Sequence, residues 1–343
     1  MNPNMSYHAV RTKIITKKGH FLNKSTWDNI LKCNSVEQLK NYLLNNVEFQ
    51  RLLNDVRNVN INRDSLEGIL RKIKNMEIID LLHYFSGDYK DFLKTILIED
   101  ELADLNLILR KIARDETLED IEKRFVHSDE FTNLPFNDLL VSKDVVQFIE
   151  SLRDTPYYME LKNLTKEDAV KREFHIEMKL YVIFYKTLLA KAEKLDKEDK
   201  EVVKEIIGYK IDLLNIQWIY RALSYYKITP EEILIYSLEG GKSINFKTLK
   251  KLCYSKSLVD FRQLVNKTLK YKYFNDYITD EGRTMDFYLF EYLNKKSNKN
   301  IGIAISFIYM LNIIINDLTT IIEGIKYNMP KEKLESYLVY KVK

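Results

Sequence analysis

Apolar residues recur along most of this chain at intervals of three and four, the spacing that places them on one face of an α-helix. The clearest run is Phe174, Met178, Tyr181, Tyr185, Leu188 and Ala192. A charged stretch, LDKEDK at 195–200, follows and predicts a bend. The apolar pattern then resumes through Ile207, Ile211, Leu214 and Trp218. This part of the sequence therefore predicts a long antiparallel helical hairpin.

A first repeated element begins at three aromatic residues, Trp27, Phe136 and Phe246, which lie 109 and 110 residues apart. Each is followed by an apolar stretch, a capping-type residue and a second apolar stretch. The capping-type residues are Ser35, Asp144 and Ser257. Because a side-chain oxygen at a helix start satisfies free backbone N–H groups, each copy predicts two short helices with a cap between them.

A second repeated element reads NLILRKIA, NIQWIYRA and DLTTIIEG in the three copies. It opens on a short polar residue and carries a small residue seven positions later. The polar residues are Asn106, Asn215 and Asp317, and the small ones are Ala113, Ala222 and Gly324. A Thr or Pro followed by acidic residues comes next, which predicts a long helix, a turn and a new helix. We expect the small residues to allow a neighbouring helix to approach closely.

Together these patterns predict an all-α fold of three related helical-bundle domains, at residues 1–125, 126–235 and 236–343, with long helices shared between the lobes. The first hairpin should bend at 86–88 and the third at 295–300. The two elements lie 79 residues apart in the first two copies and 71 in the third. The third hairpin should therefore lack about two turns of helix.

Composition supports this view and narrows the possible functions. Only 9 Gly and 5 Pro occur in 343 residues, which suits long helices. The net charge of +4 comes from 54 basic and 50 acidic residues, too balanced for a typical nucleic-acid-binding protein. Two basic clusters, Arg11 to Lys18 and Lys267 to Lys272, are predicted to be solvated helix faces.

The two cysteines, Cys33 and Cys253, indicate a reducing compartment and are expected to be small core residues.

The most apolar segment, IGIAISFIYMLNIII at 301–315, spans 15 residues and then meets Asn316 and Asp317. It is shorter than the roughly 20 apolar residues that cross a bilayer. We therefore predict a helix buried within the bundle. The first residues, 1–11, contain no apolar run of the kind that a signal peptide needs.

One stretch resembles a catalytic motif. YSLEGGKS, at 236–243, ends in the Gly-Lys-Ser that completes a phosphate-binding loop. That loop also needs a glycine where this chain has Tyr236, and it should follow a β-strand. We instead predict a helix C-cap, in which Gly240 and Gly241 supply left-handed backbone angles. The five histidines are scattered, and no catalytic, metal-binding or cofactor-binding residue is predicted.

Three features of this chain resemble the C subunit of prokaryotic V-type (A-type) rotary ATPases, a family that includes the d subunit of the eukaryotic V-ATPase. They are the segment DLLNIQWIYRALSYYKITPEEI at 212–233, the loop at Gly240 and Gly241, and NDLTTIIEGIKYNMPKEKL at 316–334. The segment YHAVRTKI at 7–14 is similar to the opening helix of that family. The resemblance extends over essentially the whole chain.

The resemblance implies a funnel of three helical domains around a pseudo-threefold axis, on the cytoplasmic face of the membrane. Such a protein is a non-catalytic part of an ion-translocating motor. It couples the central shaft, built of the D and F subunits, to the ring of membrane-embedded proteolipid subunits, and it binds neither nucleic acid nor nucleotide directly. Two other hypotheses remain at this point: a generic α-helical adaptor that binds other proteins, and an enzyme of unknown type.

Overall fold

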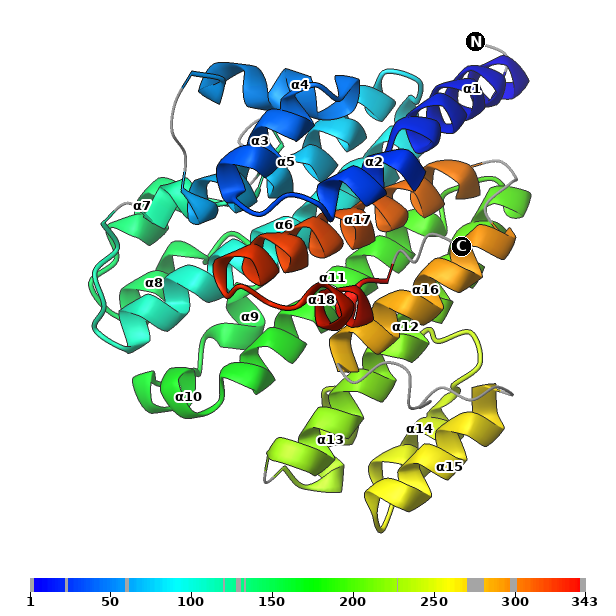
Figure 1. The fold of residues 1–343 in the computed structure, drawn as a ribbon. Helices are drawn as coiled ribbons and strands as arrows, with labels where there is room; N and C mark the ends of the chain where they lie inside the picture. Colours follow the sequence, from blue (N-terminus) through cyan, green and yellow to red (C-terminus); the bar gives the residue numbers. More distant parts are fainter. Residues whose placement is uncertain are drawn as a thin grey trace.

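The computed structural model describes residues 3–21, 24–58, 62–119, 121–127, 131–132, 134–226, 228–269, 281–296 and 301–339. Every regular element within these ranges is a helix, which confirms the all-α prediction (Figure 1). The fold is built around three antiparallel pairs of long helices. These are α5 (Arg63–Leu82) with α6 (Gly87–Ala113), α11 (Glu173–Ala192) with α12 (Lys197–Tyr225), and α16 (Glu281–Lys296) with α17 (Gly302–Lys326).

The hairpins follow the predicted pattern. The first two bends fall where glycine or the charged run interrupts the apolar spacing, between Leu82 and Gly87 and between Ala192 and Lys197. The third lies after Lys296, at positions largely outside the described residues. The return arm of the third hairpin is shorter than that of the second, since α17 has 25 residues against 29 in α12. This arm is thus about one helical turn shorter. The other arm, α16, borders positions outside the described residues, so the full loss of about two turns stays a prediction.

The apolar seam of the second hairpin is buried. On α11 the fully buried seam residues are Phe174, Met178, Tyr185, Leu188 and Ala192. The return arm α12 buries Ile207, Ile211, Leu214 and Trp218. Tyr181, half-buried, meets Trp218 edge to face with ring centres 5.7 Å apart. Both arms of the hairpin therefore bury their apolar faces, and this ring contact joins them.

The six long helices form a closed circuit. Following the chain, each packs on the next, and the last, α17, packs back on α5 (Figure 1). The N-terminal helix α1 (Pro3–Phe21) also lies along α17, and the rings of Phe21 and Phe307 are 6.4 Å apart. Arg63 at the start of α5 pairs with Glu323 near the end of α17. The first and last parts of the chain thus share one core.

The starts of the three return arms meet at one place. Asp199, at the start of α12, accepts hydrogen bonds from the Tyr89 hydroxyl of α6 at 2.6 Å and from the Ile301 backbone N–H, just before α17, at 3.2 Å. Gly302 packs so closely against Val202 that a Cβ atom there would lie 2.6 Å from the Val202 Cγ1 atom. These contacts fix the spacing of the three hairpins at their bends.

The short helix pairs carry the predicted caps. The pairs are α2 (Lys24–Ile30) with α3 (Val36–Leu44), α7 (Phe136–Leu140) with α8 (Val145–Ser151), and α14 (Phe246–Cys253) with α15 (Leu258–Leu269). Ser35, Asp144 and Ser257 each accept a backbone N–H three residues along the chain, at 3.1, 2.8 and 3.1 Å. The two-helix prediction and its three caps are therefore confirmed.

Each short pair packs against a long helix of a different copy. Helix α8 contacts α6, α14 and α15 contact α12, and α3 contacts α17. Among the three opening aromatics, Trp27 and Phe136 are buried, whereas Phe246 is 63% exposed. The remaining helices are α4 (Val47–Leu53), α9 (Tyr158–Leu161), α10 (Lys166–Lys171), α13 (Pro230–Ile235), α18 (Lys331–Tyr337) and 3₁₀ turns at Asn54–Val56 and Ile121–Arg124.

Helix α17 contains the apolar segment singled out in the sequence. By length and composition it is the one helix, among the residues searched, that could cross a bilayer. Yet 78% of its apolar window is buried inside the protein, so the prediction of a bundle-core helix is confirmed.

Candidate functional site

A buried polar side chain on each return arm holds the segment that follows the next short helix. Asp104 of α6 accepts the backbone N–H groups of Val126 and His127, at 3.0 and 2.9 Å. Asn215 of α12 accepts the N–H of Leu238 at 2.8 Å and donates to its carbonyl at 2.9 Å. Because such groups replace water as partners of buried backbone, these contacts fix where the chain returns from each turn.

The third return arm makes the same contact. Asp317 of α17, fully buried, accepts the N–H of Val339 at 3.0 Å. Asn215 and Asp317 were singled out from the sequence. In the first copy the residue with this role is Asp104, whereas Asn106 is half-buried. An aliphatic neighbour does not separate the two candidates, because Asp104 and Asn106 precede Leu105 and Leu107, just as Asn215 and Asp317 precede Ile216 and Leu318.

The small residues of the second element are all buried within the fold. Ala113 and Ala222 are 2% and 1% exposed. At Gly324 the reason for a small side chain is visible, since a Cβ atom there would lie 2.7 Å from the Leu334 Cδ1 atom of α18. Helix α18 therefore approaches α17 at this glycine.

The Gly-Lys-Ser loop lies against α12. The Asp212 carboxylate accepts the N–H groups of Ser243 and Ile244, at 2.6 and 3.1 Å, and the Lys242 N–H donates to the Gly208 carbonyl at 3.1 Å. In a phosphate-binding loop such N–H groups face the ligand. Here a carboxylate and a carbonyl of the protein itself hold these three, so the loop is arranged as a structural joint.

The helix before this loop ends earlier than predicted. Helix α13 stops at Ile235, where Ser237 donates its hydroxyl to the Ile233 carbonyl at 2.7 Å, so the glycines do not cap it. Gly240 does adopt a left-handed angle, with φ of 92°, whereas Gly241 does not, so the prediction for Gly241 is wrong. The Lys242 ammonium binds Glu205 at 2.6 Å and the Tyr292 hydroxyl at 2.9 Å.

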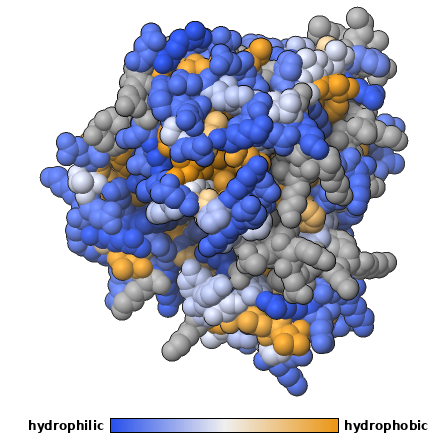
Figure 2. All heavy atoms as spheres, in the orientation of Figure 1, coloured by the Kyte–Doolittle hydropathy of each residue, from blue (hydrophilic) through white to orange (hydrophobic). Residues whose placement is uncertain are grey.

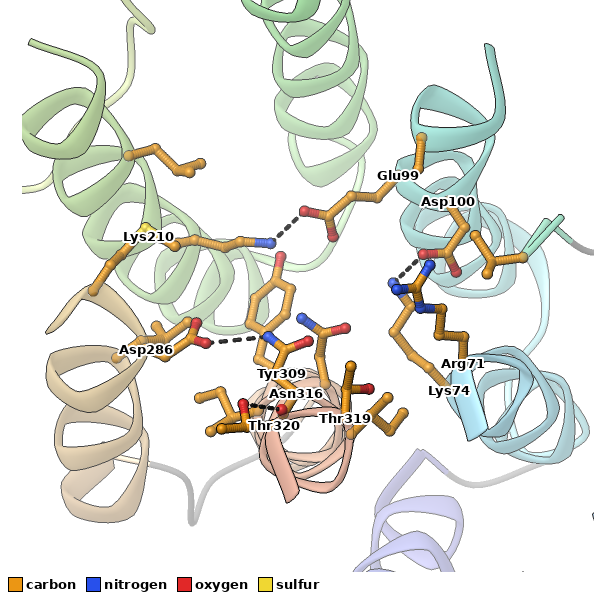
Figure 3. A pocket seen from close by; sticks show the side chains of 18 of the residues that line it. Arg71, Lys74, Glu99, Asp100, Lys210, Asp286, Tyr309, Asn316, Thr319 and Thr320 are labelled. Atoms are coloured by element: carbon orange, nitrogen blue, oxygen red, sulfur yellow. Dashed lines mark hydrogen bonds and ion pairs between the residues drawn. The ribbon is translucent and has the colours of Figure 1, made fainter. Parts of the chain in front are cut away.

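A cavity of about 590 Å³ lies among the three hairpins (Figure 3). Every long helix contributes to its wall, for example Lys74 of α5, Glu99 of α6, Tyr181 of α11, Lys210 of α12, Asp286 of α16 and Asn316 of α17. The wall is strongly polar for a space inside a helical bundle. None of these six residues was predicted as a site from the sequence.

Residues that line the cavity form two ion pairs. The Lys210 ammonium binds Glu99 at 2.6 Å, joining the first and second hairpins, and also lies 4.2 Å from the centre of the Tyr309 ring on the third. Lys74 binds Asp100 at 2.5 Å. Burial raises the pKa of Asp100 to about 6, against the opposing effect of Lys74. For Glu99 burial acts in the same direction, but Lys210 and Lys74 outweigh it and hold the pKa below its ordinary value.

The rest of the wall offers hydrogen-bonding groups. Asn316 donates to Asp286 at 3.1 Å, and Asn312, Thr319 and Thr320 line the space beside them. Paired charges, amides and hydroxyls suit the binding of a polar chain segment. Among the described residues that line the cavity, no nucleophile is held beside a base, the arrangement that covalent catalysis requires.

A buried carboxyl beside the cavity gives a testable pH dependence. Glu101 of α6 is 6% exposed, and burial raises its pKa to about 7, against the opposing effects of Thr132 and His127. Because the pKa of Glu101 is higher in the folded protein than in the unfolded chain, the folded protein binds this proton more tightly. The stability that the proton provides is fully present below the unfolded-state pKa and is lost as the pH rises through 7. We expect Glu101→Gln to remove up to about 3 kcal/mol of this dependence between about pH 4.5 and 8.

Urea unfolding of both proteins across this pH range checks the prediction. Glu119→Gln, at an exposed position, is the control and should follow the wild-type profile. An unchanged slope in Glu101→Gln would contradict the assignment.

Comparison with known proteins identifies the family. The family model described as "ATP synthase (C/AC39) subunit" matches residues 10–337. The chain belongs to this family. Curated relatives are named as the C subunit of A-type ATP synthases. The protein from Archaeoglobus fulgidus is 26% identical over 249 residues, covering 68% of each chain. That from Methanosarcina acetivorans is 20% identical over 258 residues, covering 75% of this chain and 70% of the relative.

Membership in the C/AC39 family confirms the resemblance seen in the sequence and makes the chain a component of a rotary ATP synthase.

The two cysteine thiols fit a structural role. Cys253 is fully buried, and burial raises its thiol pKa to about 11, so it is held as the unreactive thiol. Cys33 is half-buried, and burial raises its pKa as well.

Proposed function

We propose that this chain is a non-catalytic rotor component that couples the D–F shaft to the proteolipid ring, on the cytoplasmic face of the membrane. The observation that carries the proposal is the polar cavity lined by all three hairpins, which we assign as the socket for the end of the shaft. A shaft end seated there would contact all three hairpins at once. Torque would then reach the whole body of the protein and not a single helix.

The fold also has the stiffness that such a role requires. Asp199 joins the three hairpins at their bends, and Asp104, Asn215 and Asp317 hold the segments at the other ends of the return arms. A twist applied at the cavity would have to break these buried contacts before the lobes could move separately. This supports a body that transmits rotation with little bending.

A bulky residue in the cavity tests the assignment. Thr320 is half-buried, lines the cavity and donates its hydroxyl to the Asn316 carbonyl at 2.8 Å. We expect Thr320→Trp to lower binding of the purified D–F pair at least tenfold, because the indole would occupy space that the shaft needs. Binding of the proteolipid ring in detergent should be unchanged.

Thr187→Trp is the matched control. Thr187 is also half-buried on a long helix and donates to the carbonyl four residues earlier, at 2.9 Å, but it does not line the cavity. Equal shaft binding by both variants would refute the socket. If the wild-type chain bound neither the D–F pair nor the ring, the rotor proposal itself would be wrong and a generic adaptor would be favoured.

A further inference from the structure

The third short helix pair carries an unusual concentration of positive charge. Residues 246–269, which form α14 and α15, contain six basic residues and one acidic residue, a net charge of +5. The whole chain has a net charge of +4, so the other residues together are slightly negative. One hairpin of 24 residues therefore accounts for the basic character of the protein.

The fold does not require this charge. The corresponding pair at 27–44 has two basic and two acidic residues, and the pair at 136–151 has one basic and three acidic residues. All three pairs have the same type of cap, and each contacts a long helix. The charge of α14–α15 must therefore serve something other than the packing of the pair.

The basic side chains are available for binding. Lys247, Lys250, Lys251, Lys256 and Lys267 are all exposed. None of the five lies within 4.0 Å of a carboxylate in the part of the chain that the structure describes. The acidic residue on the hairpin is Asp260, and Glu231 of the neighbouring α13 accepts the Tyr254 hydroxyl at 2.8 Å.

Apolar side chains are exposed among these lysines. Phe246 and Val259 are each 63% exposed, and Tyr254 is 42% exposed. Figure 2 shows apolar surface bordered by hydrophilic atoms at the lower end of the molecule, where α14 and α15 project from the body in Figure 1. Aromatic and aliphatic side chains beside lysines are typical of protein surfaces at a membrane interface.

We propose that the α14–α15 hairpin binds an anionic lipid surface. The lysines would lie among the phosphate headgroups while Phe246, Tyr254 and Val259 enter the interfacial layer. A protein partner is a poorer match, because lysine is depleted at protein–protein interfaces and arginine is enriched there. Five of the six basic residues on this hairpin are lysines. The inference does not depend on the proposed rotor function, since the isolated chain should bind lipid without the rest of the complex.

Vesicle flotation tests the charge contribution. The wild-type chain should bind phosphatidylcholine vesicles containing a quarter phosphatidylglycerol, should bind pure phosphatidylcholine weakly, and should dissociate as salt is raised. Lys250→Glu/Lys251→Glu should lower the affinity for the mixed vesicles at least tenfold, given about fivefold for each basic residue near such a surface. The control Lys143→Glu/Lys162→Glu makes the same change in net charge on exposed residues elsewhere and should bind normally.

A second pair of variants tests the apolar contribution. Val141 and Val146 hold the positions of Tyr254 and Val259 relative to the helix caps of their own pairs, and are 74% and 73% exposed. Tyr254→Ser/Val259→Ser should weaken vesicle binding several-fold, and Val141→Ser/Val146→Ser should not. These substitutions are all at exposed positions, and circular dichroism should show wild-type helicity in each variant.

Three results would overturn the inference: no wild-type binding to the mixed vesicles, equal binding to neutral vesicles, or equal loss in variant and control. A fourth would replace it. If Lys250→Glu/Lys251→Glu abolished binding of the proteolipid ring in detergent, where no bilayer is present, the hairpin would be a protein interface. That result would refute lipid binding and leave the rotor function intact.

Discussion

Gly241→Ala is expected to lower the free energy of unfolding by about 2–4 kcal/mol, whereas Lys242→Ala should cost less than about 1 kcal/mol. A Cβ atom on Gly241 would overlap the Asp212 Oδ1 atom and lie 2.9 Å from the Ile244 carbonyl oxygen. The methyl group would therefore push the loop away from Asp212 and break the bonds from Ser243 and Ile244 that hold it. Because Asp212 is fully buried, a lost N–H partner is not replaced by water.

Lys242 contributes much less because its ion pair is partly solvated. Its side chain is 32% exposed and that of Glu205 is 37% exposed, so water screens the pair. Urea unfolding of the two variants compares these effects directly. A larger loss for Lys242→Ala than for Gly241→Ala would mean that the lysine, and not the close approach of the backbone, sets the structure of this loop.

Asp104→Ala should be at least as damaging, with an expected loss of about 3–5 kcal/mol. Its carboxylate accepts two backbone N–H groups and also lies 2.8 Å from the Nδ1 atom of His127. Asp104 is 2% exposed and His127 is 8% exposed. Removing the carboxylate would leave several buried donors without their acceptor.

Asn106→Ala is the matched comparison, because Asn106 lies on the same helix two residues later and is half-buried. We expect a loss below about 1 kcal/mol there. Thermal and urea unfolding measure both. Equal losses would show that the contact to the returning segment is not what stabilises this end of α6.

The parts of the fold that could be predicted from the sequence are those set by local chemistry. Helical periodicity places Phe174 and Leu188 on one buried seam, and a side-chain oxygen at Ser35 or Asp144 caps the helix that follows it. Each of these depends on residues within a few positions of one another. The all-α fold, the first two bends and the shorter return arm of the third hairpin follow from such patterns alone.

The cavity could not be predicted in this way. Lys210 and Glu99 are 111 residues apart and belong to helical surfaces on which charged residues are common. Only the packing of α6 on α11, and of α11 on α12, brings them together, away from bulk water. The role of Asp104 is hidden from the sequence for a related reason. It depends on Val126 and His127, which lie 22 and 23 residues further along the chain.

The closure of α17 on α1, α3 and α5 has a consequence for how this protein is made. During synthesis α1 and the first hairpin emerge long before α17, the helix that covers them. Phe21 of α1, for example, can contact Phe307 only after α17 has been synthesised. Apolar surface on the N-terminal third should therefore remain exposed to chaperones and proteases until the C-terminal third leaves the ribosome. Chains that stop before α17 should be degraded, and their accumulation should fall sharply compared with chains that include Lys326.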